Sequence, residues 1–139
     1  MVGWIAMTAL VFGLMSALWT ILGPDGAFQP EAWDVSSGWI VGSIAVGLAA
    51  AVAGGATCAK ISDGPAGLWI LVGIVILTGI LSAFLQMTEP GTAPGPRPVD
   101  VDMAAAMTTA RQPMWMAFVN PVLGVVGAVF GARLVGRRG

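Results

Sequence analysis

Histidine is missing from this sequence, and cysteine occurs once, as Cys58. Histidine is the usual axial ligand of haem, a common ligand of zinc and the usual base for a serine nucleophile. A single cysteine allows neither an internal disulfide nor a paired-cysteine redox centre. We therefore expect no catalytic residues, no cofactor and no metal site, and the sequence predicts a protein that is not an enzyme.

Charged residues are also scarce. They make up 9% of the 139 residues, and hydrophobic residues make up 57%, whereas about a quarter of an average soluble domain is charged. The net charge of −1 leaves no basic surface for nucleic acid. This composition predicts an all-α integral membrane protein, surrounded by membrane lipids, with a single domain over residues 1–139.

Four long apolar runs account for most of the chain. Each has about the 20 residues that a helix needs to cross the hydrocarbon of a bilayer, and turn-forming glycines and prolines separate the runs. The expected spans are residues 2–22, 38–59, 66–87 and 115–135. The first span lacks a basic leader and is too long for the apolar part of a signal peptide, so we expect it to be retained. The predicted fold is a four-transmembrane-helix bundle.

Basic residues are distributed unequally between the two sides of this layout. One side holds Lys60, Arg133, Arg137 and Arg138, and the other holds Arg97 and Arg111. The side with more lysine and arginine usually stays in the cytoplasm. We therefore expect both termini to be cytoplasmic, and loops 23–37 and 88–112 to be extracytoplasmic.

The second of these loops contains a predicted short helix. Asp100 or Asp102 could cap a helix whose Met103 and Met107 share one face. Methionines gather on this side of the layout, at positions 87, 103, 107, 114 and 116. Thioethers bind copper(I), but a methionine stripe is more often the apolar face of an interfacial helix. We expect the helix to lie on the outer membrane surface.

The four spans contain no acidic residue, and their one basic residue, Arg133, lies near the end of the last span. From there its side chain can reach the interface. Proton and ion transporters usually keep an ionisable group inside the bundle. The sequence therefore argues against active transport.

Small residues recur at helical spacing in the second and fourth spans. The glycines concerned are Gly38, Gly42, Gly47 and Gly55 in the second span and Gly124, Gly127 and Gly131 in the fourth. Such faces let two helix backbones approach closely. They predict packing within the bundle or, as an alternative, docking onto another membrane protein.

A polar layer is predicted near the outer end of the spans. Counting inward from each outer interface gives one polar residue per span at a similar depth, namely Ser16, Ser43, Ser82 and Asn120. Pro121 follows Asn120 and leaves the carbonyl of Ala117 without its helical hydrogen bond. The layer could be a set of interhelical hydrogen bonds or a shallow outward-facing pocket for a lipid, a quinone or another amphipathic molecule.

Two stretches of the sequence carry a resemblance to a known group. They are 22–28 (LGPDGAF) with Trp33, Ser36 and Trp39, and 112–115 (QPMW) with Asn120-Pro121 and the glycine-rich last span. Together they resemble a group of small four-span bacterial inner-membrane proteins with no assigned function. The resemblance implies a bacterial inner-membrane location and the four-span fold, and it implies no activity, ligand or site.

Two hypotheses for function follow. The first is a non-catalytic accessory or scaffold subunit of a larger membrane complex, partnered by other integral membrane subunits. The second is a homo-oligomer that binds or passes a lipid, quinone or other small solute through the polar layer. A glycine face turned towards a neighbour would favour the first hypothesis, and an outward-facing cavity beside Asn120 would favour the second.

Overall fold

The computed structural model describes residues 2–62, 64–88 and 95–136 of the chain. Within them the helices are α1 (Val2–Ala27), α2 (Ser37–Ile61), α3 (Ala66–Thr88), α4 (Met103–Thr109) and α5 (Met114–Gly136). All but α4 are long and apolar enough to cross a membrane. The fold is therefore all-helical with four helices of membrane-spanning length, as the sequence predicted.

Local residue chemistry explains where several helices begin and end. The regular run of α1 breaks at Gly23, whose φ of 63° is open to glycine at little cost, and a last turn follows Pro24. Ser36 caps α2, because its Oγ accepts a hydrogen bond from the backbone N–H of Trp39 at 3.1 Å. Asp102 caps α4 in the same way, through the N–H of Ala105 at 2.7 Å. Of the two expected caps for this helix, Asp102 is the one used.

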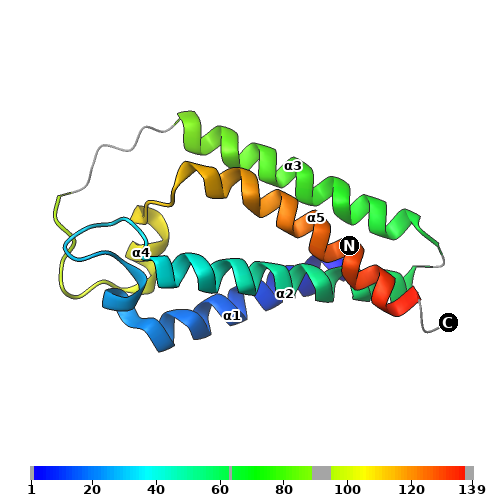
Figure 1. The fold of residues 1–139 in the computed structure, drawn as a ribbon, viewed down its shortest axis with the longest axis horizontal. Coiled ribbons are helices and arrows are strands. Elements are labelled where there is room, and N and C mark those ends of the chain that lie inside the picture. Colours follow the sequence, from blue (N-terminus) through cyan, green and yellow to red (C-terminus); the bar gives the residue numbers. More distant parts are fainter. Residues whose placement is uncertain (1, 63, 89–94, 137–139) are drawn as a thin grey trace.

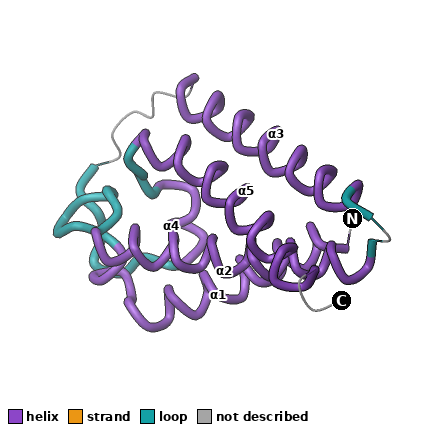
Figure 2. Tube along the Cα trace, turned by 45° about the vertical axis from the view of Figure 1, so that its right-hand side comes forward, coloured by secondary structure: helices purple, strands orange, loops and turns teal. Residues whose placement is uncertain are grey.

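The four long helices follow one another in the order α1, α2, α5, α3, as both views show (Figure 1, Figure 2). The central pair is α2 and α5; α1 packs on α2, and α3 packs on α5. Among the described residues, α1 and α3 share no comparable contact. The bundle is thus a row rather than a square. Along the length of these helices, the start of α1 and the end of α5 lie at one end of the molecule, and α4 lies at the other (Figure 1).

At the end where α5 finishes, glycines bring α2 and α5 into backbone contact. A Cβ on Gly55 would overlap the backbone of Ala128, and a Cβ on Gly131 would overlap that of Val52. Gly127 lies against Ala51, where a Cβ would come within 2.7 Å of the alanine Cβ. We call this end the inner end. Its glycines permit the close approach that small-residue faces predict.

The opposite, outer end carries a folded cap built from residues 24–36 and 95–111. Its core contains the buried residues Ala27, Phe28, Val35, Val101 and Ala106. Trp19 packs edge-on against Phe28 at 6.2 Å and against Trp39 at 6.0 Å between ring centroids. Such aromatic packing stabilises the cap beyond simple burial. The loops of this end form a small core of their own.

Arg97 joins the two segments of the cap. Its side chain is only 6% exposed; one terminal nitrogen donates to Asp25 at 2.9 Å, and the guanidinium lies over the Phe28 ring at 5.6 Å. Its backbone N–H donates to the carbonyl of Glu31 at 3.2 Å. The sequence had marked Arg97 only as a charge on the outer side. In the structure it closes one loop onto the other.

Candidate binding cleft

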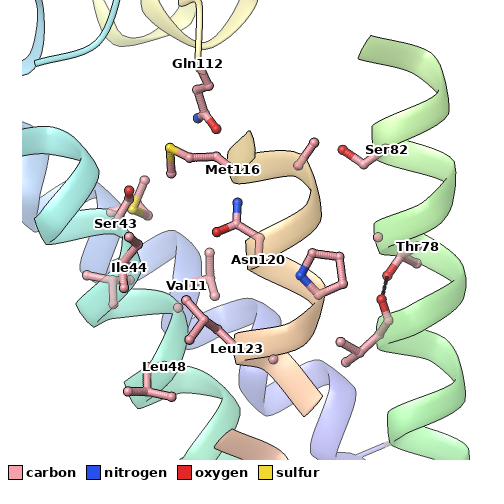
Figure 3. Close-up of a pocket in the computed structure, with 18 of the residues that line it drawn as sticks. Val11, Ser43, Ile44, Leu48, Thr78, Ser82, Gln112, Met116, Asn120 and Leu123 are labelled. Carbon is pink, nitrogen blue, oxygen red and sulfur yellow. Dashed lines mark hydrogen bonds between the residues drawn. The ribbon is translucent and has the colours of Figure 1, made fainter. Parts of the chain in front are cut away.

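A cleft of about 600 Å³ opens where α2 and α5 separate towards the outer end. Its walls come from all four long helices, and the connection from α4 to α5 covers it (Figure 3). The lining on α2 and α5 stops at Leu48 and Gly124. The next close contact between the two helices follows directly, where Gly127 approaches the carbonyl of Leu48. The volume lies within the range of small-molecule sites, about 300–1,000 Å³.

Asn120 lies in the middle of this cleft, and its side chain points from α5 towards α2 (Figure 3). No other described residue forms a hydrogen bond to its side-chain amide. Pro121, the next residue, supplies no N–H to the carbonyl of Ala117, and both residues also line the cleft. The Asn120 amide therefore faces the cleft without a partner among the described residues, at a point of α5 where Pro121 interrupts the regular helical hydrogen bonds.

Gln112 brings a second amide to the cleft from above (Figure 3). Its position follows from its neighbour: the N–H of Arg111 donates to the carbonyl of Trp33 at 2.8 Å, and the carbonyl of Arg111 accepts from Val35 at 3.1 Å. These two bonds hold the strand-like segment before α5 against the first loop of the cap. The Gln112 amide, like that of Asn120, has no hydrogen-bond partner within the described ranges. No sequence pattern indicated the pairing of Arg111 with Trp33 and Val35, because these residues lie far apart in the chain.

The predicted polar layer is only partly assembled. Ser43 lines the cleft from α2, with its hydroxyl donating to the carbonyl of Ile40 in its own helix at 2.9 Å. Ser82 lines it from α3, on the other side of α5 from the Asn120 amide (Figure 3), and its hydroxyl accepts from Gln86 at 3.4 Å. Ser16 lies apart from the cleft and donates to the carbonyl of Phe12 at 2.8 Å. The structure thus brings Ser43, Ser82 and Asn120 to the cleft and leaves Ser16 out.

The predicted glycine faces are occupied within the chain. Besides the inner contacts of Gly55, Gly127 and Gly131, Gly124 approaches Val75 of α3, and Gly42 approaches Leu18 of α1. Two of the predicted glycines make no close contact with another helix. A Cβ on Gly38 would make only ordinary contacts, and one on Gly47 would meet open space at the wall of the cleft. Most of these glycines therefore serve contacts inside the row of helices.

A second hollow of about 330 Å³ lies beneath α4. Trp19, Phe28 and Trp39 form part of its wall, and Met103 and Met107 face it from α4. It adjoins the cleft, because the two share lining residues: Val11, Met15, Met107, Ala110 and Gln112. The methionine face of α4 borders this hollow, and Met107 keeps 64% of its surface exposed. Its predicted place on the membrane surface stays a prediction.

The linings of both spaces are uncharged. Among the described residues, no Asp, Glu, Lys or Arg borders either one. In the same part of the chain, no three His, Cys, Asp or Glu side chains gather as a metal ion would require. The polar groups that do line the cleft are neutral amides, hydroxyls and backbone carbonyls. The described lining therefore offers hydrogen-bonding groups and shape but no charged side chain.

Fold and cleft together define a class: a helical protein with four membrane-length helices and an uncharged cleft beneath a folded cap. Comparison with family models, with curated proteins and with solved structures found no match. The resemblance to small bacterial inner-membrane proteins stays a prediction.

Proposed function

We propose that this chain is a non-catalytic membrane protein that binds a small amphipathic molecule in the cleft between α2 and α5. The observation that supports this is the pair of amides, Asn120 and Gln112, that face one open cleft without partners among the described residues. Both amides are exposed within the open cleft. A ligand there can accept or donate hydrogen bonds to them, and the apolar walls favour its hydrocarbon part.

The shape of the cleft favours binding over passage. Its lining on α2 and α5 ends where the glycine contacts of the inner end begin. Backbone contact at Gly55 and Gly131 leaves no room between these two helices for a solute to continue inward. Along α1 the lining continues inward to Met7 and Trp4, so this closure concerns the α2–α5 side of the cleft, where it suits a bound molecule better than a path between these two helices.

We also propose that the cleft opens towards the extracytoplasmic side of a bacterial inner membrane. Lys60 and Arg133 lie in the last turns of α2 and α5, at the inner end of the row. Arg137 and Arg138, which supported the same orientation, lie outside the described residues. The side richer in basic residues usually faces the cytoplasm, which places the cap and the cleft outside.

The accessory-subunit hypothesis has less support from these contacts. It was based on glycine faces in excess of what the bundle needs, and most of these glycines pack against α1, α3 or each other's helices. The role of an accessory subunit stays a prediction. Homo-oligomerisation, the other part of the second hypothesis, stays one as well.

The test is native mass spectrometry of the full chain after gentle extraction from its source membrane. We expect a reproducible added mass on the wild-type protein. Asn120→Leu preserves side-chain size but removes the amide, and we expect about a tenfold lower occupancy, because one hydrogen bond in an apolar site is lost. Ser16→Ala is the matched control, since Ser16 lies outside the cleft and bonds within its own helix. It should retain the added mass.

Two results would contradict this proposal. One is a wild-type protein without added mass that travels with a large complex at fixed stoichiometry, which would favour the accessory role. The other is an added mass that Asn120→Leu and Ser16→Ala leave equally intact, since the ligand would then lie elsewhere.

A further inference from the structure

The cleft is elongated along the helices. On α1 its lining runs from Trp4 to Met15, and on α3 it runs from Val75 to Gln86. Each range covers eleven residue steps, or roughly 16 Å at the helical rise of 1.5 Å per residue. One leaflet provides half of the hydrocarbon thickness of a bilayer, about 15 Å. The cleft is therefore a groove at least as long as one leaflet is thick.

The groove is also narrow. A volume of about 600 Å³ spread over a length of roughly 16 Å corresponds to a mean cross-section of about 40 Å². A helix of that length and about 10 Å across would occupy roughly 1,250 Å³, which is about twice the volume of the groove. A transmembrane helix of a partner is therefore too wide for the groove, whereas an extended hydrocarbon chain is not.

Polarity changes from one end of the groove to the other. Gln86 and Gln112 border its outer end, and Trp4 and Met7 border its inner end. Asn120 lies deeper than Gln112 (Figure 3). A side-chain amide can donate its N–H groups to a carbonyl oxygen, and aromatic and thioether side chains pack well on hydrocarbon. The groove thus suits a molecule whose polar end points outward and whose hydrocarbon points inward.

The inner end of the groove is closed, and one of its sides is open. Trp4 and Met7 pack against the buried cluster that contains Leu71 and Val75 of α3, and this cluster forms a floor. Along the side, α1 and α3 share no comparable contact among the described residues. Further out, large side chains of α3 such as Leu81 are exposed, and in a membrane such faces contact lipid chains. A lipid chain can therefore enter between α1 and α3 without crossing the cap.

We propose that the groove binds one hydrocarbon chain of a glycerolipid, taken from the leaflet on the side of the cap. The chain lies along α1 with its end at Trp4 and Met7, and its ester carbonyl lies near the amides of Gln86 and Gln112. This inference rests on the proposed binding function and adds the ligand class and its orientation. A glycerolipid fits better than a free fatty acid, because it places a neutral ester rather than a carboxylate beside a described lining without charged side chains.

Photo-crosslinking provides the test. The full chain held in amphipol is titrated with a phosphatidylcholine that carries a diazirine at the far end of one acyl chain, and the labelled residues are located by peptide mass spectrometry. We expect saturable labelling near Trp4 and Met7, at the inner end. A diazirine placed next to the glycerol should instead label the region of Gln86 and Gln112. Unlabelled phosphatidylcholine should compete, and oleate should not.

Two glycine variants compare the groove with an outer surface. Gly47 lines the groove, and a Cβ there would meet open space. Gly47→Leu therefore fills part of the groove and should lower the saturable labelling about tenfold, the effect of losing contact with about two methylene groups. A Cβ on Gly73 would also meet open space, at an exposed position of α3 outside the groove. Gly73→Leu is therefore the matched control and should leave the labelling unchanged.

The outcomes separate the two proposals. Labelling that spreads over the exposed residues of α3 without saturation would overturn this inference, and so would labelling of Gln86 and Gln112 by the chain end. Equal competition by oleate would overturn the choice of a glycerolipid. The depth of labelling in the wild-type chain decides the orientation even where Gly47→Leu does not fold.

The native added mass keeps the binding function testable on its own. An added mass that Asn120→Leu removes, in a chain without saturable labelling, would overturn the ligand class and leave the proposed binding function intact. A chain with neither an added mass nor saturable labelling would overturn both proposals.

Discussion

The inner and outer halves of the α2–α5 pair are made of similar small and apolar residues, yet they pack differently. In the inner half, Gly55 and Gly131 each meet the partner's backbone. In the outer half, Gly47 belongs to the same glycine series and faces open space. The difference lies in what the glycines meet. In the inner half they meet the backbone of Ala128 and Val52, whereas in the outer half Gly47 lines a cleft together with Met116 and Asn120. A glycine series therefore marks where helices can approach, and the partner decides whether they do.

The largest expected effect comes from adding one methyl group to the inner half, with the same addition to the outer half as its control. Gly131→Ala places a Cβ on the backbone of Val52, so the helices must move apart. We expect a loss in the free energy of unfolding near the upper end of the range of about 1–3 kcal/mol for overpacking. Gly47→Ala is the matched control and should be neutral or slightly stabilising. Unfolding in a detergent titration measures both, and equal losses would mean that the two halves are packed alike.

A second, smaller effect concerns the contact between α3 and α5. A Cβ on Gly79 would overlap the ring of Pro121, which is a side chain rather than backbone and can shift. We expect Gly79→Ala to cost about 1–2 kcal/mol. Pro121→Ala removes the ring, so the double variant should lose less than the sum of the two single variants. Additive losses in the same titration would show that the ring does not limit the approach of α3.

The smallest effect is expected at the cap. Arg97→Gln removes the stacking on Phe28 and the bond to Asp25. Because Asp25 is 88% exposed, the ion pair contributes little, and the cation–π contact is worth about 0.5–1 kcal/mol. We expect a red shift of the Trp33 emission with little change in global stability. The reason is that the indole N–H of Trp33 donates to the carbonyl of Gly95, which lies in the same segment as Arg97. Arg133→Gln, on an exposed residue of the inner end, is the control. An unchanged spectrum in Arg97→Gln would show that the cap holds without this residue.

Much of the fold follows from local sequence. The ends of the predicted spans agree with the observed helices to within two residues, once the break of α1 at Gly23 is taken as its end. The short helix was also expected, and Asp102 is one of the two caps proposed for it. Length, apolarity and capping are properties of neighbouring residues, so the chain displays them before it folds. The side of the membrane that each end faces stays a prediction.

The candidate site was less accessible from sequence. Depth counting grouped Ser16 with Asn120, but depth says nothing about the direction in which a side chain points around its helix. Gln112 was not singled out as a site residue, because its place depends on the hydrogen bonds of Arg111 to Trp33 and Val35. Contacts between distant segments leave no periodic pattern in the chain.

The sequence by itself determined that this protein has four helices of membrane length, that they carry glycines able to pack closely, and that its polar groups are few and mostly uncharged. Tertiary structure alone decided the order of the helices in the row, which glycines meet a backbone, and which polar side chains face one cleft. The physical reason is that apolarity and helix length are summed along the chain, whereas a cleft exists only where two packed surfaces fail to meet.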